Sequence, residues 1–149
     1  MIQIDINNRQ STQPDQQSRL TEAVRKVLLE EGICNATISL AVVDDKTIHD
    51  LNRRYLQHDE PTDVLSFELA RGQDHLEGEI IVSAETAAEA AKRLGCRAED
   101  ELLLYVIHGS LHLAGYDDTS QEARTIMRGR EQYYLDQWNV KGLANTGLV

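Results

Sequence analysis

Residues 102–113 read LLLYVIHGSLHL, and AGYDD follows at residues 114–118. A helix with this sequence would carry apolar side chains on nearly every side, so the stretch predicts a helix buried in the middle of the fold. Acidic residues at 99–101 favour the start of that helix, where its dipole is positive, and Gly115 favours its end. The other elements are expected to pack around it.

The two histidines of this stretch predict a metal site. His108 and His112 are four positions apart, so both face the same side of a helix and can hold one ion from successive turns. After Gly115 the reversing chain can bring Asp118 or Asp117 toward the same point. Two imidazoles and one oxygen ligand leave a coordination position open, which is typical of a catalytic zinc site rather than a structural one.

The alternative is a pair of core histidines whose ring nitrogens are satisfied by hydrogen bonds. The H-E-x-x-H pattern of zinc proteases does not apply, because Gly109 stands where that pattern has its glutamate base. The two-histidine, one-carboxylate set also describes the iron triad of oxygenases, whose usual site lies on strands rather than on one helix.

The hydrophobic periodicity of the whole chain predicts an α+β fold. It has a small, mixed, four-stranded sheet, about five helices mainly against one face, and the metal site at the end of the central buried helix. The expected strands are 2–6, 38–43, 64–69 (opened by Pro61) and 78–83, and the expected helices run from Pro14 to near Gly32, from Asp44 or Asp45 to about Leu56, from Ala84 to Leu94, through the histidines to Ala114, and from a capping box at 119–122 to near Trp138.

The length of 149 residues suits a single domain, 1–149, with a loose tail from about residue 141. The longest apolar run, 102–107, is far shorter than the ~20 residues that cross a bilayer, so no membrane association is expected. Cys34 and Cys96 have no paired spacing, and no secretory leader precedes Ile2. We therefore expect a cytoplasmic protein in which both thiols are small core fillers.

The formal net charge of -10 argues against indiscriminate coating of nucleic acid, which would be repelled at long range. A local basic strip is still compatible with that charge, and it would use the arginines of two predicted helices: Arg53, Arg54, Arg124, Arg128 and Arg130. The alternative is that they are solvated helix faces that balance Glu122 and Glu131.

Three separated stretches carry a resemblance to a known family. HGSLHLAGYD at 108–117 meets ten successive positions of the pattern H-G-x-L-H-L-x-G-Y-D-H, and two further matches are LNRRY at 51–55 with DEPTDVLSF at 59–67, and GEIIVS at 78–83. The chain thus resembles the YbeY family of metal-dependent endoribonucleases, which take part in ribosomal RNA maturation. The resemblance implies a YbeY-like fold, one Zn²⁺ per chain held by three side chains, and a role in 3′ maturation of small-subunit ribosomal RNA and in ribosome quality control.

Carried over by position, the resemblance makes His108 and His112 metal ligands and places Asp118 where the family has a third histidine. A carboxylate donates more negative charge than imidazole, so it should weaken the pull of the ion on a bound water and favour harder divalent metals. Leu56 stands where the family usually has an arginine after Tyr55, and leucine can neither bind phosphate nor stabilise its charge.

The function that follows is hydrolysis of a single-stranded RNA phosphodiester by metal-activated water. Candidates for the general base are Glu79, Asp63 and Asp117, with structural alternatives in strand-edge charge, turn formation and support of a ligating histidine. The expected partner is ribosomal RNA in the small ribosomal subunit, with no small organic cofactor. The alternative function is a ribosome-associated module that keeps its metal but has weakened catalysis.

Overall fold

The four strands form one mixed sheet in the computed structural model, which describes residues 1–56 and 63–140. The strands are β1 (Ile2–Asn8), β2 (Ala36–Val43), β3 (Val64–Arg71) and β4 (Leu76–Ser83), in the order β1-β2-β4-β3. β1 and β4 both pair with β2 in parallel, and β3 pairs with β4 in antiparallel orientation. The predicted small mixed sheet is confirmed.

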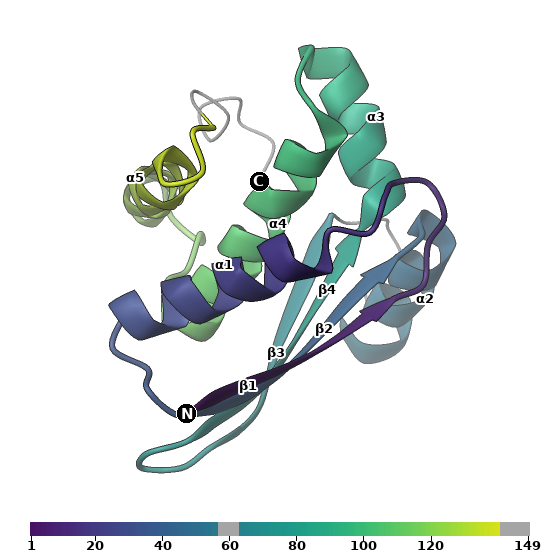
Figure 1. The fold of residues 1–149 in the computed structure, drawn as a ribbon. Helices are drawn as coiled ribbons and strands as arrows, with labels where there is room; N and C mark the ends of the chain where they lie inside the picture. The colour runs from purple at the N-terminus through teal and green to yellow at the C-terminus, as the bar shows by residue number, and fades with distance from the viewer. Residues whose placement is uncertain (57–62, 141–149) are drawn as a thin grey trace.

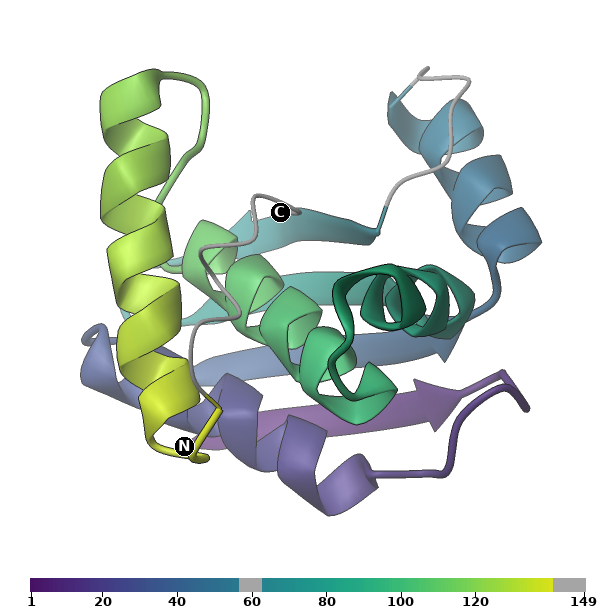
Figure 2. The same cartoon turned by 90° about the horizontal axis from the view of Figure 1, so that it is seen from above.

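The five helices of the described residues are α1 (Gln17–Glu30), α2 (Asp45–Leu56), α3 (Ala84–Leu94), α4 (Ala98–Leu113) and α5 (Gln121–Asp136). Figure 1 shows α1 and α4 above one face of the sheet, with α3 and α5 on either side of α4. The view from above in Figure 2 shows α4 lying between α3 and α5. The predicted α+β class with helices mainly on one face is therefore confirmed.

Helix α2 packs against the other face of the sheet. Its Ile48 belongs to a small buried cluster with Val43, Leu65 and Ile81. Successive residues of a strand point to opposite faces, and accordingly Ile80, the neighbour of Ile81, belongs to the main core instead. β4 is thus covered on both faces. This explains why its residues 80–82 are all apolar instead of alternating with polar residues.

Helix α4 is the centre of the core, as its composition predicts. All its residues from Glu101 to Leu111 are buried. It contacts α1, α3, α5, β3 and β4. Gly109 lets it approach the sheet closely, since a Cβ at this position would stand 2.8 Å from Cγ2 of Ile80 and 3.0 Å from Oγ of Ser66.

Two of the predicted helix boundaries depend on local signals that the structure confirms. The Ser83 hydroxyl accepts a hydrogen bond from the Thr86 N–H and caps α3 (3.1 Å). Gly115 has φ 112° and follows α4 in a Schellman arrangement, in which the Tyr116 N–H bonds to the Leu111 carbonyl (3.0 Å).

The capping box predicted at 119–122 is wrong by one residue. Ser120, not Thr119, is the N-cap of α5, and its hydroxyl accepts from the Ala123 N–H (3.0 Å). Thr119 is engaged elsewhere, because its N–H and its hydroxyl both bond to the Asp117 carboxylate.

The expectation of two core thiols is wrong for Cys34, which is exposed, whereas Cys96 is partly buried and packs against the main core. Pro61 and the predicted tail from residue 141 lie outside the described residues. Every helix that the structure describes is too short or too polar to span a membrane.

Candidate metal centre

His108 and His112 project from adjacent turns near the C-terminal end of α4. Their Nε2 atoms are 3.0 Å apart, and the two rings meet edge to face at 84° with centroids 4.6 Å apart. His108 is almost completely buried, whereas 27% of the His112 side chain is exposed. The pair therefore lies at the boundary between the core and the solvent.

The outer nitrogen of each ring contacts an oxygen acceptor. Nδ1 of His108 lies 2.5 Å from a carboxylate oxygen of Glu131 on α5, and Nδ1 of His112 lies 3.0 Å from the Tyr116 carbonyl. A backbone carbonyl only accepts, and the buried Glu131 carboxylate accepts when ionised, so each neutral ring carries its proton on Nδ1. Both Nε2 atoms then present lone pairs toward each other.

Asp118 supplies the third atom of the cluster. Its Oδ2 lies 3.7 Å from Nε2 of His108 and 3.5 Å from Nε2 of His112, and 43% of its side chain is exposed. The chain reversal at Gly115 brings it there, and Arg124 holds the segment by donating to the Asp118 carbonyl (3.2 Å).

These three atoms suit a divalent cation. The lone pairs of the two Nε2 atoms and the carboxylate oxygen of Asp118 face one another and repel. A positive charge between them would relieve this repulsion. Ligands at the ~2.0–2.2 Å bond lengths of a tetrahedral zinc stand ~3.3–3.6 Å apart, close to the observed separations of 3.0, 3.5 and 3.7 Å. Burial, together with the neighbouring His108, also lowers the pKa of His112, which keeps its ring neutral and able to ligate. The cluster could thus bind a metal ion.

The three candidate bases lie at different distances from this cluster. Asp117 directly precedes Asp118, but its carboxylate turns to Thr119 and it is exposed. Asp63 lies beside the N-terminal half of α4, where burial first, and then the charge of Asp63, raise the pKa of Glu101. The structure does not bring it into the histidine cluster.

Glu79 lies on the far side of the sheet. It stands between Gly78, which packs on Leu113 of α4, and Ile80 of the main core, so strand alternation directs it to the opposite face. The side chain of Leu56, at the end of α2, is outside the part that the structure describes.

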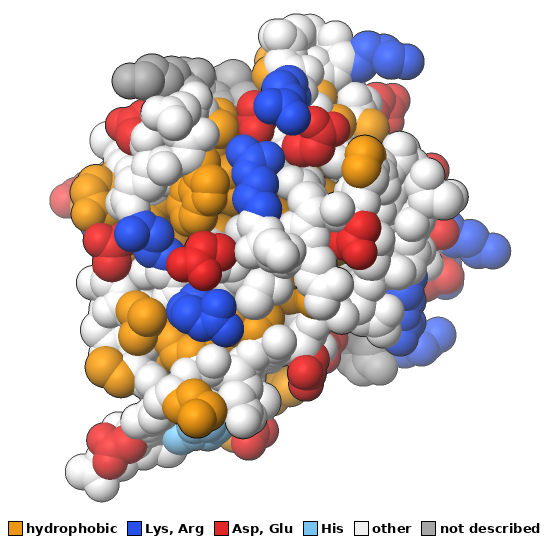
Figure 3. Space-filling view, viewed as in Figure 1, with side chains coloured by type: hydrophobic (Ala, Val, Ile, Leu, Met, Phe, Trp, Pro, Cys, Tyr) orange, Lys and Arg blue, Asp and Glu red, His pale blue; other side chains and the backbone are white. Residues whose placement is uncertain are grey.

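Three of the five arginines in the predicted basic strip contact neighbouring residues. Arg130 is bound to Glu31, Arg124 to the Asp118 carbonyl, and Arg53 to Asp50. On the face seen in Figure 3, positive and negative side chains are interspersed.

Glu131 is the site residue that the sequence did not reveal. It is 1% exposed, so it does not belong to the solvated helix face on which the alternative interpretation of the arginines placed it. The available signal was its helical face, which it shares with the buried Met127, Tyr134 and Leu135. An acid in that apolar stripe needs a partner, and the partner is His108.

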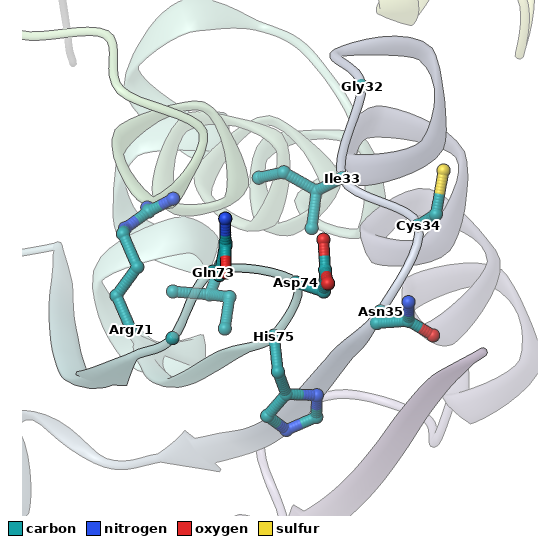
Figure 4. A pocket seen from close by; sticks show the side chains of 10 residues that line it. Gly32, Ile33, Cys34, Asn35, Arg71, Gln73, Asp74 and His75 are labelled. Atoms are coloured by element: carbon teal, nitrogen blue, oxygen red, sulfur yellow. The ribbon is translucent and has the colours of Figure 1, made fainter.

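A pocket next to the C-terminal end of α1 is unlike this cluster. It lies between the α1–β2 and β3–β4 connections, and Figure 4 shows its Cys34 and His75 side chains pointing away from each other. His75 instead lies within hydrogen-bond distance of Thr37 (3.2 Å). The pocket therefore does not gather ligands around one point.

The fold and the histidine cluster define a class: a small α+β protein in which the end of a buried helix gathers side chains able to hold a metal ion. Within that class the chain belongs to the YbeY family, because the family model described as Endoribonuclease YbeY matches residues 3–139. The resemblance carried by the three sequence stretches is confirmed.

Relatives named Endoribonuclease YbeY are similar along most of the chain. One from Syntrophotalea carbinolica is 40% identical over 139 residues, covering 88% of this chain and 92% of the relative. One from Rhodopirellula baltica is 42% identical over 116 residues, or 76% of this chain, and the match spans 60% of that longer relative. The solution structure of TM1509 from Thermotoga maritima has a TM-score of 0.64 at 29% identity, covering 93% of this chain and 92% of that one.

Proposed function

We propose that this protein is a metal-dependent endoribonuclease that cleaves single-stranded RNA during 3′ maturation of small-subunit ribosomal RNA and ribosome quality control in the cytoplasm. The metal is Zn²⁺, one per chain, although the Asp118 ligand also suits a harder divalent ion. The observation that carries the proposal is the cluster of His108, His112 and Asp118, three converging acceptors in a chain of the YbeY family.

In this proposal, one set of residues holds the ion and a second set orients the two histidine rings. His108, His112 and Asp118 hold the ion, while Glu131 and the Tyr116 carbonyl fix the two rings with Nε2 facing inward. The bound ion supplies a Lewis acid that activates a water and neutralises charge on the phosphoryl oxygens. His112 and Asp118 are partly exposed, so an RNA phosphate would have access to an ion that they hold.

For the general base, the geometry favours Asp117 over the other two candidates. Asp117 is exposed and directly precedes the proposed ligand Asp118, so its carboxylate would have to leave Thr119 to act on a water held by the ion. Glu79 lies on the opposite face of the sheet, and Asp63 lies toward the other end of α4.

His112→Ala tests the metal site and the activity together. With one imidazole removed, we expect protein purified without a histidine tag to lose its stoichiometric metal and its cleavage of a single-stranded ribosomal RNA fragment. The measurements are elemental analysis and RNA cleavage with and without chelator. His75→Ala removes a histidine that lies outside the cluster and contacts Thr37 instead, so it is the control and should retain both. Full metal content in His112→Ala would contradict the ligand set.

The second candidate is a ribosome-associated module with weakened catalysis. It is favoured by Asp118 in place of the third family histidine and by Leu56 in place of the family arginine. Tight metal binding without cleavage under Zn²⁺, Mn²⁺ or Mg²⁺, combined with binding to the small ribosomal subunit, is the result that selects this module.

A further inference from the structure

A partly buried polar cluster joins α1 to the segment that leaves the metal centre. Glu31, which follows α1 directly, accepts a hydrogen bond from the Tyr116 hydroxyl on Oε1 (2.7 Å). Its Oε2 accepts from the Tyr134 hydroxyl (2.5 Å) and from Arg130 (2.6 Å). Only 11% of the Glu31 side chain is exposed. Two tyrosine hydroxyls and two N–H groups of Arg130 thus donate to one partly buried carboxylate, which makes Glu31 a well-satisfied anchor.

The contact with Tyr116 is the one that leads to the metal centre. The Tyr116 carbonyl is the acceptor for Nδ1 of His112, and Asp118 follows two residues later. The N–H of Tyr116 is fixed by the Leu111 carbonyl, and its hydroxyl is fixed by Glu31. The residue is therefore held at both ends, with the His112 acceptor between them.

We propose that Glu31 is a positioning residue of the metal centre, which acts through Tyr116 to hold the His112 ring and the Asp118 segment in the geometry that binds the ion. The inference deepens the proposed function, because it rests on the same metal centre. Glu31 itself touches none of the three proposed ligands and holds the Nδ1 acceptor of His112 through a residue 85 positions away in sequence.

Tyr116→Phe is the direct test, because it removes one hydroxyl and leaves the backbone acceptor in place. Tyr134→Phe is the matched control. It removes a second tyrosine hydroxyl from the same Glu31 carboxylate but does not touch the segment after α4. A purely structural role of the cluster predicts similar effects of both variants, whereas positioning through Tyr116 predicts an effect of only one.

The first readout is the ¹⁵N NMR signature of the His112 ring in the full chain without added metal. The parent and Tyr134→Phe should show the Nδ1–H tautomer, and Tyr116→Phe should show a mixture of tautomers. Identical His112 spectra in all three proteins would overturn the inference. This readout needs no metal, so it decides the role of Glu31 even if the parent binds no zinc and the proposed function fails.

The second readout is zinc affinity by chelator competition. Tyr116→Phe and Glu31→Ala, which removes the acceptor, should each weaken it by about tenfold, in the range seen when residues that orient a metal ligand are removed. In the double variant the zinc affinity should fall no further than in the weaker-binding single variant, because both changes break the same hydrogen bond between Tyr116 and Glu31. Tyr134→Phe should bind zinc within about twofold of the parent. The inference would be overturned if the losses of zinc affinity added up in the double variant, or if Tyr134→Phe lost as much affinity as Tyr116→Phe.

Discussion

At the scale of single residues, the contact between Glu131 and His108 determines how the metal centre is arranged. The carboxylate accepts a hydrogen bond from the Nδ1–H group of the ring inside the core, which fixes the tautomer and directs Nε2 toward His112 and Asp118. A negative charge at this place also makes the imidazole a stronger ligand. Glu131 should thus affect metal binding without contacting the ion.

Glu131→Gln tests this contact. The amide retains the shape and an acceptor oxygen but loses the charge, so we expect zinc affinity to fall roughly 10-fold to 100-fold. Chelator competition measures the change, and Glu122→Gln, an exposed acid on the same helix, should leave the affinity unchanged. Parent-like zinc binding by Glu131→Gln would contradict the orienting role.

Asp118→His tests the third ligand. Imidazole donates less negative charge than carboxylate, so the variant should keep its metal and cleave single-stranded RNA faster than the parent. Metal content and the initial cleavage rate are the measurements. The companion variant Asp118→Ala should bind zinc more weakly, and equal affinity there would remove Asp118 from the ligand set.

Helical spacing and a glycine that reverses the chain predict that His108 and His112 meet Asp117 or Asp118, and the resemblance to the YbeY family selects Asp118. The sequence does not predict Glu131, which reaches the ring only through the packing of α5 on α4. Tyr116 is within the recognised motif, but its connection to Glu31 spans two helices and is visible only in three dimensions.

At the scale of elements, the close packing of α4 on the sheet depends on Gly109. Alanine has the higher intrinsic helix propensity, but here its Cβ would collide with Ile80 and with the Ser66 hydroxyl, which donates to the Gly109 carbonyl. We expect Gly109→Ala to lower the free energy of unfolding by about 1–3 kcal/mol.

Gly129→Ala on α5 is the matched control, because nothing lies within 4 Å of a Cβ at that position. It should raise the free energy of unfolding by about 0.5–1 kcal/mol, the ordinary gain from glycine to alanine in a helix. Denaturant titration of both variants is the measurement. A stabilised Gly109→Ala would show that α4 does not need this close approach.

Local signals predict most element boundaries but cannot choose between adjacent equivalent residues. Thr119 and Ser120 are both good N-caps, and the choice is made by Asp117, which engages Thr119. Likewise, β4 begins two residues before the predicted start because its pairing with β2 continues to Leu76. Such extensions depend on the partner strand rather than on the residues themselves.

At the scale of the whole molecule, the sequence predicts the α+β class and the central place of α4, because both follow from hydrophobic patterns along the chain. The strand order and the position of α2 depend on which strands pair, which those patterns leave open. Connections between distant helices are beyond sequence patterns too, and the bond between Glu31 and Arg130, which ties α1 to α5, is the main example.

This connection should make stability depend on pH. Burial alone would raise the pKa of Glu31, but hydrogen bonds from Tyr134, Tyr116 and Arg130 outweigh it and lower the pKa below its ordinary value of 4.5. A lowered folded-state pKa stabilises the protein fully above that value, and the stabilisation is lost as the pH falls through the folded pKa.

Glu31→Gln should therefore be less stable than the parent at pH 7, by about 2 kcal/mol for hydrogen bonds to a charged group. The difference should shrink as the pH falls below 4.5. Denaturant titrations across this range measure it. A difference that stays constant at every pH would show that the ionised Glu31 carboxylate contributes no stability.

The most direct test of the whole account is a crystal structure of the protein purified without a histidine tag, with anomalous diffraction collected at the zinc edge. We predict one anomalous peak per chain at about 2.0–2.2 Å from Nε2 of His108, Nε2 of His112 and a carboxylate oxygen of Asp118. No peak in zinc-loaded crystals, or a peak bound elsewhere while the two imidazoles point apart, would contradict the metal centre on which the proposed function depends.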